Sequence, residues 1–181
     1  MALSHAIMTA LLEEDLSGYE LAKRFDTSLG YFWHASHQQI YKELSKMADS
    51  DWLSAKSVAQ SGKPNKVIYS LTPLGKETLD QWVLAAGKVQ PPKDDFLVKL
   101  FNVGHSDVAP ILAELDDRQK SAQERLALYQ QIRRKHPAKP ESLPDTQKGV
   151  YLTLLLGIRQ ETLNLQWYDE VRTLLSTVKA E

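Results

Sequence analysis

Four polar residues, Gln38, Lys42, Ser45 and Lys46, fall on one side when residues 36–49 are placed at helical spacing. A Gln amide can pair with the N6 and N7 atoms of adenine. A Lys ammonium can donate to guanine or to a phosphate oxygen, and a short Ser side chain lets a helix sit deep in a groove. The pattern therefore predicts a helix face whose chemistry suits the edges of DNA bases.

The residues around this face add candidate contacts with nucleic acid. Backbone amides at a helix N-terminus, with Ser and Tyr hydroxyls, suit phosphate oxygens. The turn SGKPNK places two lysines and an asparagine where a hairpin would reach the adjacent backbone or minor groove. The predicted DNA contacts are Ser36, Gln38, Gln39, Tyr41, Lys42, Ser45, Lys46, Lys63, Asn65 and Lys66.

A helix that presents this face needs an apolar side to anchor it. Ile40, Leu44 and Met47 lie opposite the polar face and predict a core contact. Ser36-His-Gln-Gln39 is a capping box, in which the first and fourth residues bond each other's backbone amides. The sequence therefore predicts a helix that begins at residue 36.

Further elements flank this helix. A helix is predicted over residues 4–14, and Ser17-Gly-Tyr-Glu20 opens another with a second capping box. Residues 52–71 predict two strands around the basic turn, which is rich in Gly, Pro and Asn. Thr72-Pro73 predicts the start of a helix that runs to residue 86. The residues of this helix expected to face the core are Leu74, Leu79, Trp82 and Val83.

The C-terminal half shows only helical patterns. Helices are predicted over residues 94–103, 106–135 with Ser106 as cap, and 145–178 with Asp145 as cap. A helix of about 30 residues is roughly 45 Å long, and its apolar stripe needs a surface of equal length, which a two-fold related subunit supplies. The predicted dimer interface is Leu112, Leu115, Ala122, Leu126, Tyr129, Leu154, Ile158 and Leu165. Residues 150–158 are apolar almost all round and are expected to be buried.

Together the elements predict a mainly α fold with a small two-stranded β wing. The expected organisation is a winged helix-turn-helix domain over residues 1–86, a linker over 87–93 that contains Gly and two Pro, and a helical dimerisation domain over 94–181. A homodimer would present two copies of the polar helix to a pseudo-palindromic site. Its half-sites would lie one or two helical turns apart, at roughly 34 Å per turn.

Composition excludes several other classes of protein. The 181 residues carry a formal net charge of −1 and no Cys, and no apolar run reaches the roughly 18 residues of a spanning helix. Residues 33–66 hold five Lys against three acids, a balance of +2, whereas residues 1–32 hold five acids against two bases. There is no Gly-rich phosphate loop or nucleophile elbow, so we expect no enzyme and no cofactor. The location expected is the cytoplasm.

Two further groups of residues could form binding sites. His34 and His37 are three residues apart, as in some metal sites, but no third ligand has a suitable spacing, so capping or packing is preferred and no metal is expected. Aromatic residues near the predicted junction or interface could hold a small aromatic effector, or could simply be core. These residues are Trp82, Phe96, Phe101, Trp167 and Tyr168.

Four motifs resemble those of the PadR family of transcriptional regulators. They are Ser17-Gly-Tyr-Glu-Leu-Ala-Lys-Arg-Phe25, Gln38-Gln-Ile-Tyr-Lys-Glu-Leu44, Asp51-Trp-Leu53 and Tyr69-Ser-Leu-Thr-Pro-Leu-Gly75. Residues 94–178 resemble the longer helical region of the virulence-activator branch. The resemblance implies a winged-helix DNA-binding domain, a helical dimerisation domain and control of transcription, usually repression. The turn over residues 62–66 departs from the family in having no Arg. The alternative reading is a winged-helix module that binds proteins rather than DNA.

Overall fold

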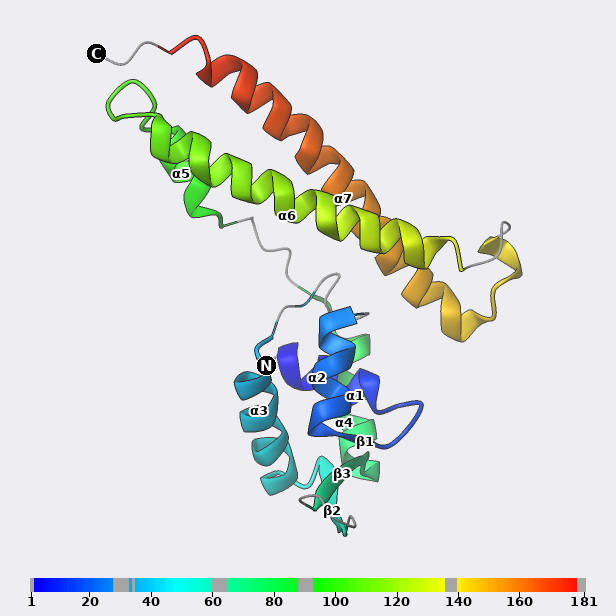
Figure 1. Cartoon of the computed structure of the whole chain (residues 1–181). Helices are drawn as coiled ribbons and strands as arrows, with labels where there is room; N and C mark the ends of the chain where they lie inside the picture. The colour runs from blue at the N-terminus through cyan, green and yellow to red at the C-terminus, as the bar shows by residue number, and fades with distance from the viewer. Residues whose placement is uncertain are drawn as a thin grey trace. The chain divides into compact units, whose positions relative to one another are not determined.

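Figure 1 shows the computed structural model, which describes residues 2–27, 33, 35–59, 65–87, 93–135 and 140–178. The chain divides into two compact units, Met1–Lys88 and Val89–Glu181. The first holds α1 (Ala2–Ala10), β1 (Leu16–Ser17), α2 (Gly18–Thr27), α3 (His37–Asp49), β2 (Leu53–Val58), β3 (Lys66–Leu71) and α4 (Pro73–Leu84). The second holds α5 (Asp95–Leu100), α6 (Ala109–Arg133), the 3₁₀ turn η2 (Pro140–Ser142) and α7 (Asp145–Leu175).

The first unit has a single apolar core to which all four of its helices contribute. Its most deeply buried side chains are Ile7, Met8, Leu21, Ile40, Leu44, Met47 and Leu79. The buried residues of each helix recur at three- and four-residue steps, which places them on one side. This core leaves the opposite side of α3 facing outward.

A small antiparallel sheet completes the first unit. The predicted hairpin is present as β2 and β3, whose register pairs Leu53 with Leu71 and Val58 with Lys66. A third strand, β1, was not predicted; it pairs Leu16 with Tyr69 on the other edge of β3. The strand order is therefore β1-β3-β2, and β3 lies in the centre.

Three of the predicted helix starts of this unit are confirmed in their hydrogen bonds. The first helix, predicted over residues 4–14, spans Ala2–Ala10. In α3, the Ser36 amide donates to Gln39 Oε1 at 2.8 Å, and the Gln39 amide donates to Ser36 Oγ at 3.2 Å. The Ser17 amide likewise donates to Glu20 Oε2 at 2.9 Å at the start of α2. At the start of α4, Thr72 Oγ1 accepts from the Gly75 amide at 3.0 Å.

The first turn of α4 is joined tightly to the junction between α3 and β2. The Trp52 carbonyl oxygen accepts from the Thr72 amide and from Thr72 Oγ1, both at 3.1 Å. A Cβ atom on Gly75 would lie 2.2 Å from that oxygen, so only glycine fits there. The prediction for the rest of α4 was partly wrong. Leu79 is buried, but Leu74, Trp82 and Val83 are exposed.

The second unit is built on α6 and α7, which run antiparallel side by side (Figure 1). Helix α6 starts later than predicted, whereas α7 already begins at Asp145, the residue predicted as its cap. Val108 occupies the cap position of α6 without a side-chain bond, and Asp107 Oδ1 accepts from the Ala109 amide at 3.0 Å. The Pro at the start of this helix fixes the turn there, so Ser106 is not the cap. Pro144 precedes α7, and Asp145 lies in its first turn instead of capping it.

The apolar start of α7 is not buried all round within one chain. Leu154 is fully buried against α6, whereas Val150, Leu152 and Leu156 are exposed. The expectation that residues 150–158 are enclosed was therefore wrong for the single chain. Because α7 packs against α6 on one side, its opposite side remains exposed.

Candidate nucleic-acid interface

Helix α3 separates its residues into a core side and an outer side. Ile40 and Leu44 are fully buried, and Met47 is nearly so. The side chains at the opposite positions are all exposed: Gln38, Tyr41, Lys42, Ser45 and Lys46. A helix with an anchored apolar back and a polar front has the form that fits a DNA major groove about 12 Å wide.

The outer side chains of α3 differ in the hydrogen bonds and ion pairs that they form within the chain. Gln38 and Lys42 make no side-chain hydrogen bond or ion pair with the part of the chain that the structure describes. Lys46 lies 3.8 Å from Glu43 and keeps 68% of its side-chain surface exposed. Ser45 Oγ donates to the Tyr41 carbonyl oxygen at 3.2 Å. The Gln38 amide and the ammonium groups of Lys42 and Lys46 are therefore among the side-chain donors available to a ligand.

Two of the predicted DNA contacts have a structural task at the start of α3. Ser36 and Gln39 bond each other's backbone amides, so the Ser36 hydroxyl and the Gln39 carbonyl oxygen already accept hydrogen bonds. Both residues are exposed. They fix the first turn of α3 and with it the direction of the neighbouring Gln38 side chain.

At the hairpin the predicted residues also divide. Asn65 is exposed beside β3, and Lys63 lies outside the described residues. Lys66 Nζ forms an ion pair with Glu20 Oε1 at 2.8 Å. Sequence reasoning missed this pair, because 46 positions separate its two residues and neither strand pattern nor helix spacing links them.

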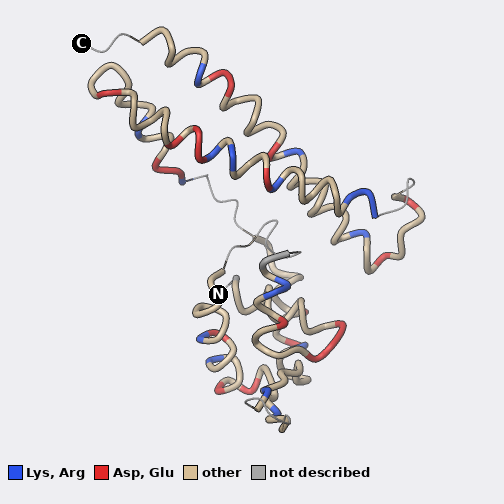
Figure 2. Tube along the Cα trace, viewed as in Figure 1, with Lys and Arg blue, Asp and Glu red and all other residues tan. Residues whose placement is uncertain are grey.

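Charge is distributed unevenly over the first unit. Figure 2 shows basic positions along α3 and acidic positions in the turn after α1. The acidic positions include Glu13, Glu14 and Asp15, all exposed. A polyanion would be attracted to one side of this unit and repelled from the other.

Comparison with known proteins agrees with this geometry. Residues 7–81 match the model of the Transcriptional regulator PadR-like family, and residues 92–176 match Virulence activator alpha C-term. The chain is similar to the probable transcriptional regulator Rv1176c of Mycobacterium tuberculosis. The two are 37% identical over 183 residues, which cover 94% of this chain and 96% of that protein. The chain belongs to the PadR-like family of transcriptional regulators.

Solved structures of PadR-like proteins resemble the whole chain. The virulence activator AphA of Vibrio cholerae is 31% identical, with a TM-score of 0.79 over 98% of this chain and 99% of AphA. PadR of Bacillus subtilis, in a structure with operator DNA, is 27% identical, with a TM-score of 0.79 over 97% of this chain and 99% of PadR. The same PadR has been solved with p-coumaric acid, and it is described as a negative transcriptional regulator. The mainly helical fold with a small winged sheet is that of the family, which is one of regulators and not of enzymes.

In the second unit of this PadR-like chain, half of the eight predicted dimer residues are buried within the subunit. Leu115, Ala122, Tyr129 and Leu154 are buried. Leu112, Leu126, Ile158 and Leu165 are partly exposed. The exposed leucines of α7 lie on its other side: Leu174 is 69% exposed, Leu152 and Leu156 are each 62% exposed, and Leu163 is 57% exposed.

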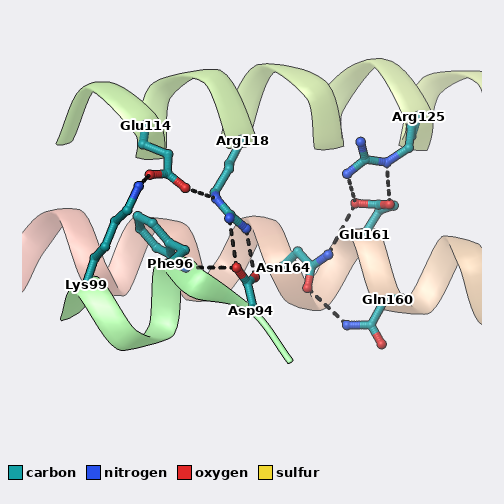
Figure 3. Close-up of polar contacts among 9 residues, drawn as sticks. All are labelled: Asp94, Phe96, Lys99, Glu114, Arg118, Arg125, Gln160, Glu161 and Asn164. Atoms are coloured by element: carbon teal, nitrogen blue, oxygen red, sulfur yellow. Dashed lines mark hydrogen bonds and ion pairs between the residues drawn. The ribbon is translucent and has the colours of Figure 1, made fainter. Parts of the chain in front are cut away.

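Polar contacts fix the helices of the second unit to one another (Figure 3). Arg118 donates to both carboxylate oxygens of Asp94 at 2.8 Å and to Glu114 at 3.0 Å, which joins the cap of α5 to α6. Arg125 donates to both oxygens of the buried Glu161 at 2.6 and 3.0 Å, which joins α6 to α7. Two-pronged pairs of this kind set the register of neighbouring helices.

The five aromatic residues predicted as an effector pocket are divided between the two units. Phe96, Trp167 and Tyr168 gather in the second unit, with ring centres 6.1 Å apart for Phe96 and Trp167. All three are part of that unit's core cluster. Phe101 is 89% exposed, and Trp82 belongs to the first unit, where it stacks on His5 at 4.4 Å.

The described ranges contain neither a metal site nor a membrane span. No group of three or more His, Asp or Glu side chains there is placed to hold a metal ion, and His34 lies outside those ranges. Within the same ranges no helix is both long enough and apolar enough to span a membrane.

Proposed function

We propose that the chain is a sequence-specific repressor that binds operator DNA as a homodimer in the cytoplasm. The observation that carries the proposal is the exposed outer side of α3, where Gln38, Lys42 and Lys46 face away from a core closed by Leu44. Residues 1–86 read the DNA, residues 94–181 form the dimer, and residues 87–93 connect them. The relative PadR of Bacillus subtilis, whose structure contains operator DNA, supports the DNA partner.

The homodimer is supported by the exposed leucines of α7. Leu152, Leu156 and Leu163 lie at four- and seven-residue spacing and so form one stripe on the side away from Leu154. Apolar side chains repeated along one helix face are typical of a helix that meets another helix. In a two-fold dimer each stripe meets its own copy, and two α3 helices are then presented to one duplex.

Repression is the direction that we propose for the control. The support is the relative from Bacillus subtilis, which aligns with 96% of this chain and is described as a negative transcriptional regulator. A protein bound to its operator opposes transcription when it occupies the position that polymerase needs.

The experiment that tests DNA binding is selection of bound duplexes from a random pool by the full-length protein. We expect enriched sequences with two inverted half-sites one or two helical turns apart. Gln38→Ala should change the enriched bases more than it changes affinity, because contacts with base edges carry the discrimination. If the wild type retains no duplex even at low salt, the protein-binding alternative replaces this proposal.

A small aromatic effector is the remaining part of the proposal. Its support is the structure of the Bacillus subtilis relative with p-coumaric acid. In this chain the test is titration with p-coumaric acid while tryptophan fluorescence is recorded, with Trp167→Phe as the matched control. A saturable change that the control lacks places the ligand at the Phe96–Trp167–Tyr168 cluster. Unchanged spectra over a panel of phenolic acids would remove the effector from the proposal.

A further inference from the structure

A hollow of about 570 Å³ lies where three elements of the first unit meet. The start of α2 contributes Ser17–Glu20, α3 contributes Tyr41, and the hairpin contributes Asn65–Val67 at its turn end with Tyr69. Two of these elements, α3 and the hairpin, carry the proposed DNA contacts. The third, the start of α2, carries none of them and touches both.

Glu20 is the residue that joins α2 to the hairpin. Its Oε1 atom accepts from Lys66 Nζ at 2.8 Å, and its Oε2 atom accepts from the Ser17 amide at 2.9 Å and from Ser17 Oγ at 2.8 Å. Ser17 itself is buried and pairs with Ile68 of β3. One carboxylate therefore caps α2 with one oxygen and holds the turn end of the hairpin with the other.

The start of α2 also contacts α3. A Cβ atom on Gly18 would lie 2.3 Å from Tyr41 Cε1, so the Tyr41 ring rests on the glycine backbone. The contact sets the distance between α3 and the first turn of α2. Through Gly18 on one side and Glu20 on the other, that turn fixes α3 and the hairpin in one arrangement.

The ionised carboxylate of Glu20 and the limited exposure of Lys66 favour a stable ion pair between them. The Lys66 ammonium and the donors of Ser17 lower the pKa of Glu20 from 4.5 to about 2, so the carboxylate is ionised at neutral pH. Lys66 keeps only 32% of its side-chain surface exposed. Its charge is opposed by that of Glu20.

We propose that Glu20 is a positioning residue for DNA binding: its ion pair with Lys66 holds the turn end of the hairpin on α2, and Lys66 serves this pair rather than a DNA phosphate. The inference rests on the proposed function, since it concerns how the hairpin is placed for the duplex. It also reassigns Lys66, which the sequence predicted as a DNA contact.

The two possible roles of Lys66 give Glu20 opposite effects. If the pair positions the hairpin, removing the Glu20 charge loosens the hairpin and weakens binding. If Lys66 binds phosphate, the same change frees its charge and strengthens binding. Glu20→Gln separates these cases cleanly, because Gln is also a capping-box residue and can still accept from the Ser17 amide.

The test measures affinity for a duplex from the random-pool selection as a function of salt, for Glu20→Gln, Lys66→Gln, the double variant and Lys46→Gln. We expect each of the first two to weaken binding about fivefold, as suits a partly exposed pair. The double variant should be no weaker than either single one, because both remove the same interaction. The salt slope should stay as in the wild type for these three. Lys46→Gln should lower the slope by about 0.9, the value for one lost phosphate contact.

Tighter binding by Glu20→Gln, or a slope lowered by about 0.9 in Lys66→Gln, would overturn the inference. A second readout needs no DNA: amide hydrogen exchange at Ile68 and Tyr69 should be faster in both single variants than in the wild type. Unchanged exchange there would also overturn it. If exchange quickens but the wild type binds no duplex, the ion pair holds the hairpin and the proposed function fails instead.

Discussion

The two units of this chain use their outer helix faces in opposite ways. In the first unit, α3 buries Leu44 and turns Lys42 and Lys46 outward. In the second unit, α7 buries Leu154 and turns Leu152 and Leu156 outward. The side away from the core is polar in one helix and apolar in the other. The outer face of α3 is thus suited to water or a polar ligand, whereas that of α7 leaves apolar surface that another molecule can cover.

This difference shows what each outer face is suited to bind. Exposed cations and amides keep their hydration until a charged ligand replaces it, and this suits a reversible contact with DNA. Exposed leucines gain free energy as soon as they leave water, and this suits a lasting contact between subunits. Four amino-acid substitutions test this comparison between the two helices.

The largest effect is expected from Leu44→Ala on the core side of α3. Leu44 is fully buried, so loss of its side chain should lower the free energy of unfolding by about 3 kcal/mol. Urea denaturation followed by tryptophan fluorescence measures this, since Trp33, Trp52 and Trp82 are in the first unit. Ser45→Ala, one residue further along, is the control and should change stability little. Equal losses in the two variants would mean that α3 does not divide into two sides.

Leu156→Asp tests the outer side of α7. Burying a leucine stabilises by about 2 kcal/mol, and a carboxylate in its place opposes burial, so we expect dimerisation to weaken by about 100-fold. Light scattering across a range of protein concentrations measures it. Gln123→Asp, at an exposed position of α6, provides the matched comparison. A Leu156→Asp protein that remains dimeric at low concentration would refute the proposed stripe.

Lys42→Ala tests the outer side of α3. It should weaken operator binding about tenfold, as expected for one lost base or phosphate contact, and should leave the melting temperature within about 2 °C of the wild type. Anisotropy titrations and thermal melts measure the two effects. Lys46→Ala should behave alike, while Lys76→Ala, on α4, should keep full affinity. A variant that unfolds the unit would show that the lysine is part of its packing.

The smallest effect is expected from Asp94→Asn in the second unit. Asn still caps α5 but loses the ion pair with Arg118, so stability at pH 7 should fall by about 1 kcal/mol. Arg118 lowers the pKa of Asp94 below its usual 3.8. The stabilisation is therefore complete above pH 4 and is lost as the pH falls through the lowered pKa.

Urea denaturation at pH 7, 4 and 2 measures the change, and the wild type and Asp94→Asn should converge at the lowest pH. Asp145→Asn removes an exposed ion pair with Lys148 and should show almost no difference. A gap between wild type and Asp94→Asn that persists at pH 2 would assign the effect to capping instead of charge.

The sequence predicted the first unit in most details because its signals are local. The capping boxes at Ser17 and Ser36 and the Thr72-Pro73 start each involve residues within one helical turn. The strand β1 was missed because two residues cannot show alternation, and its partner Tyr69 is far along the chain. The pair of Glu20 with Lys66 escaped for the same reason.

In the second unit, periodicity marked the helices but not their sides. Leu154 and Leu156 are equally apolar, and only the placement of α6 decides that the first is enclosed and the second is open. The start of α6 was placed at Ser106 because Ser is a frequent cap, whereas the bonds of Asp107 and the following Pro determine it. A single sequence cannot tell a contact within the chain from a contact between chains.

The close approach of Gly75 to the Trp52 carbonyl has a mechanical consequence. The helix by which the chain leaves the first unit, α4, is fastened at its first turn to the residue just before β2. The Gly75 backbone packs directly on the Trp52 carbonyl oxygen, which also accepts a hydrogen bond from Thr72 Oγ1. If the far end of α4 is displaced, the helix therefore rotates about this contact. The hairpin rotates with it and does not separate from α4.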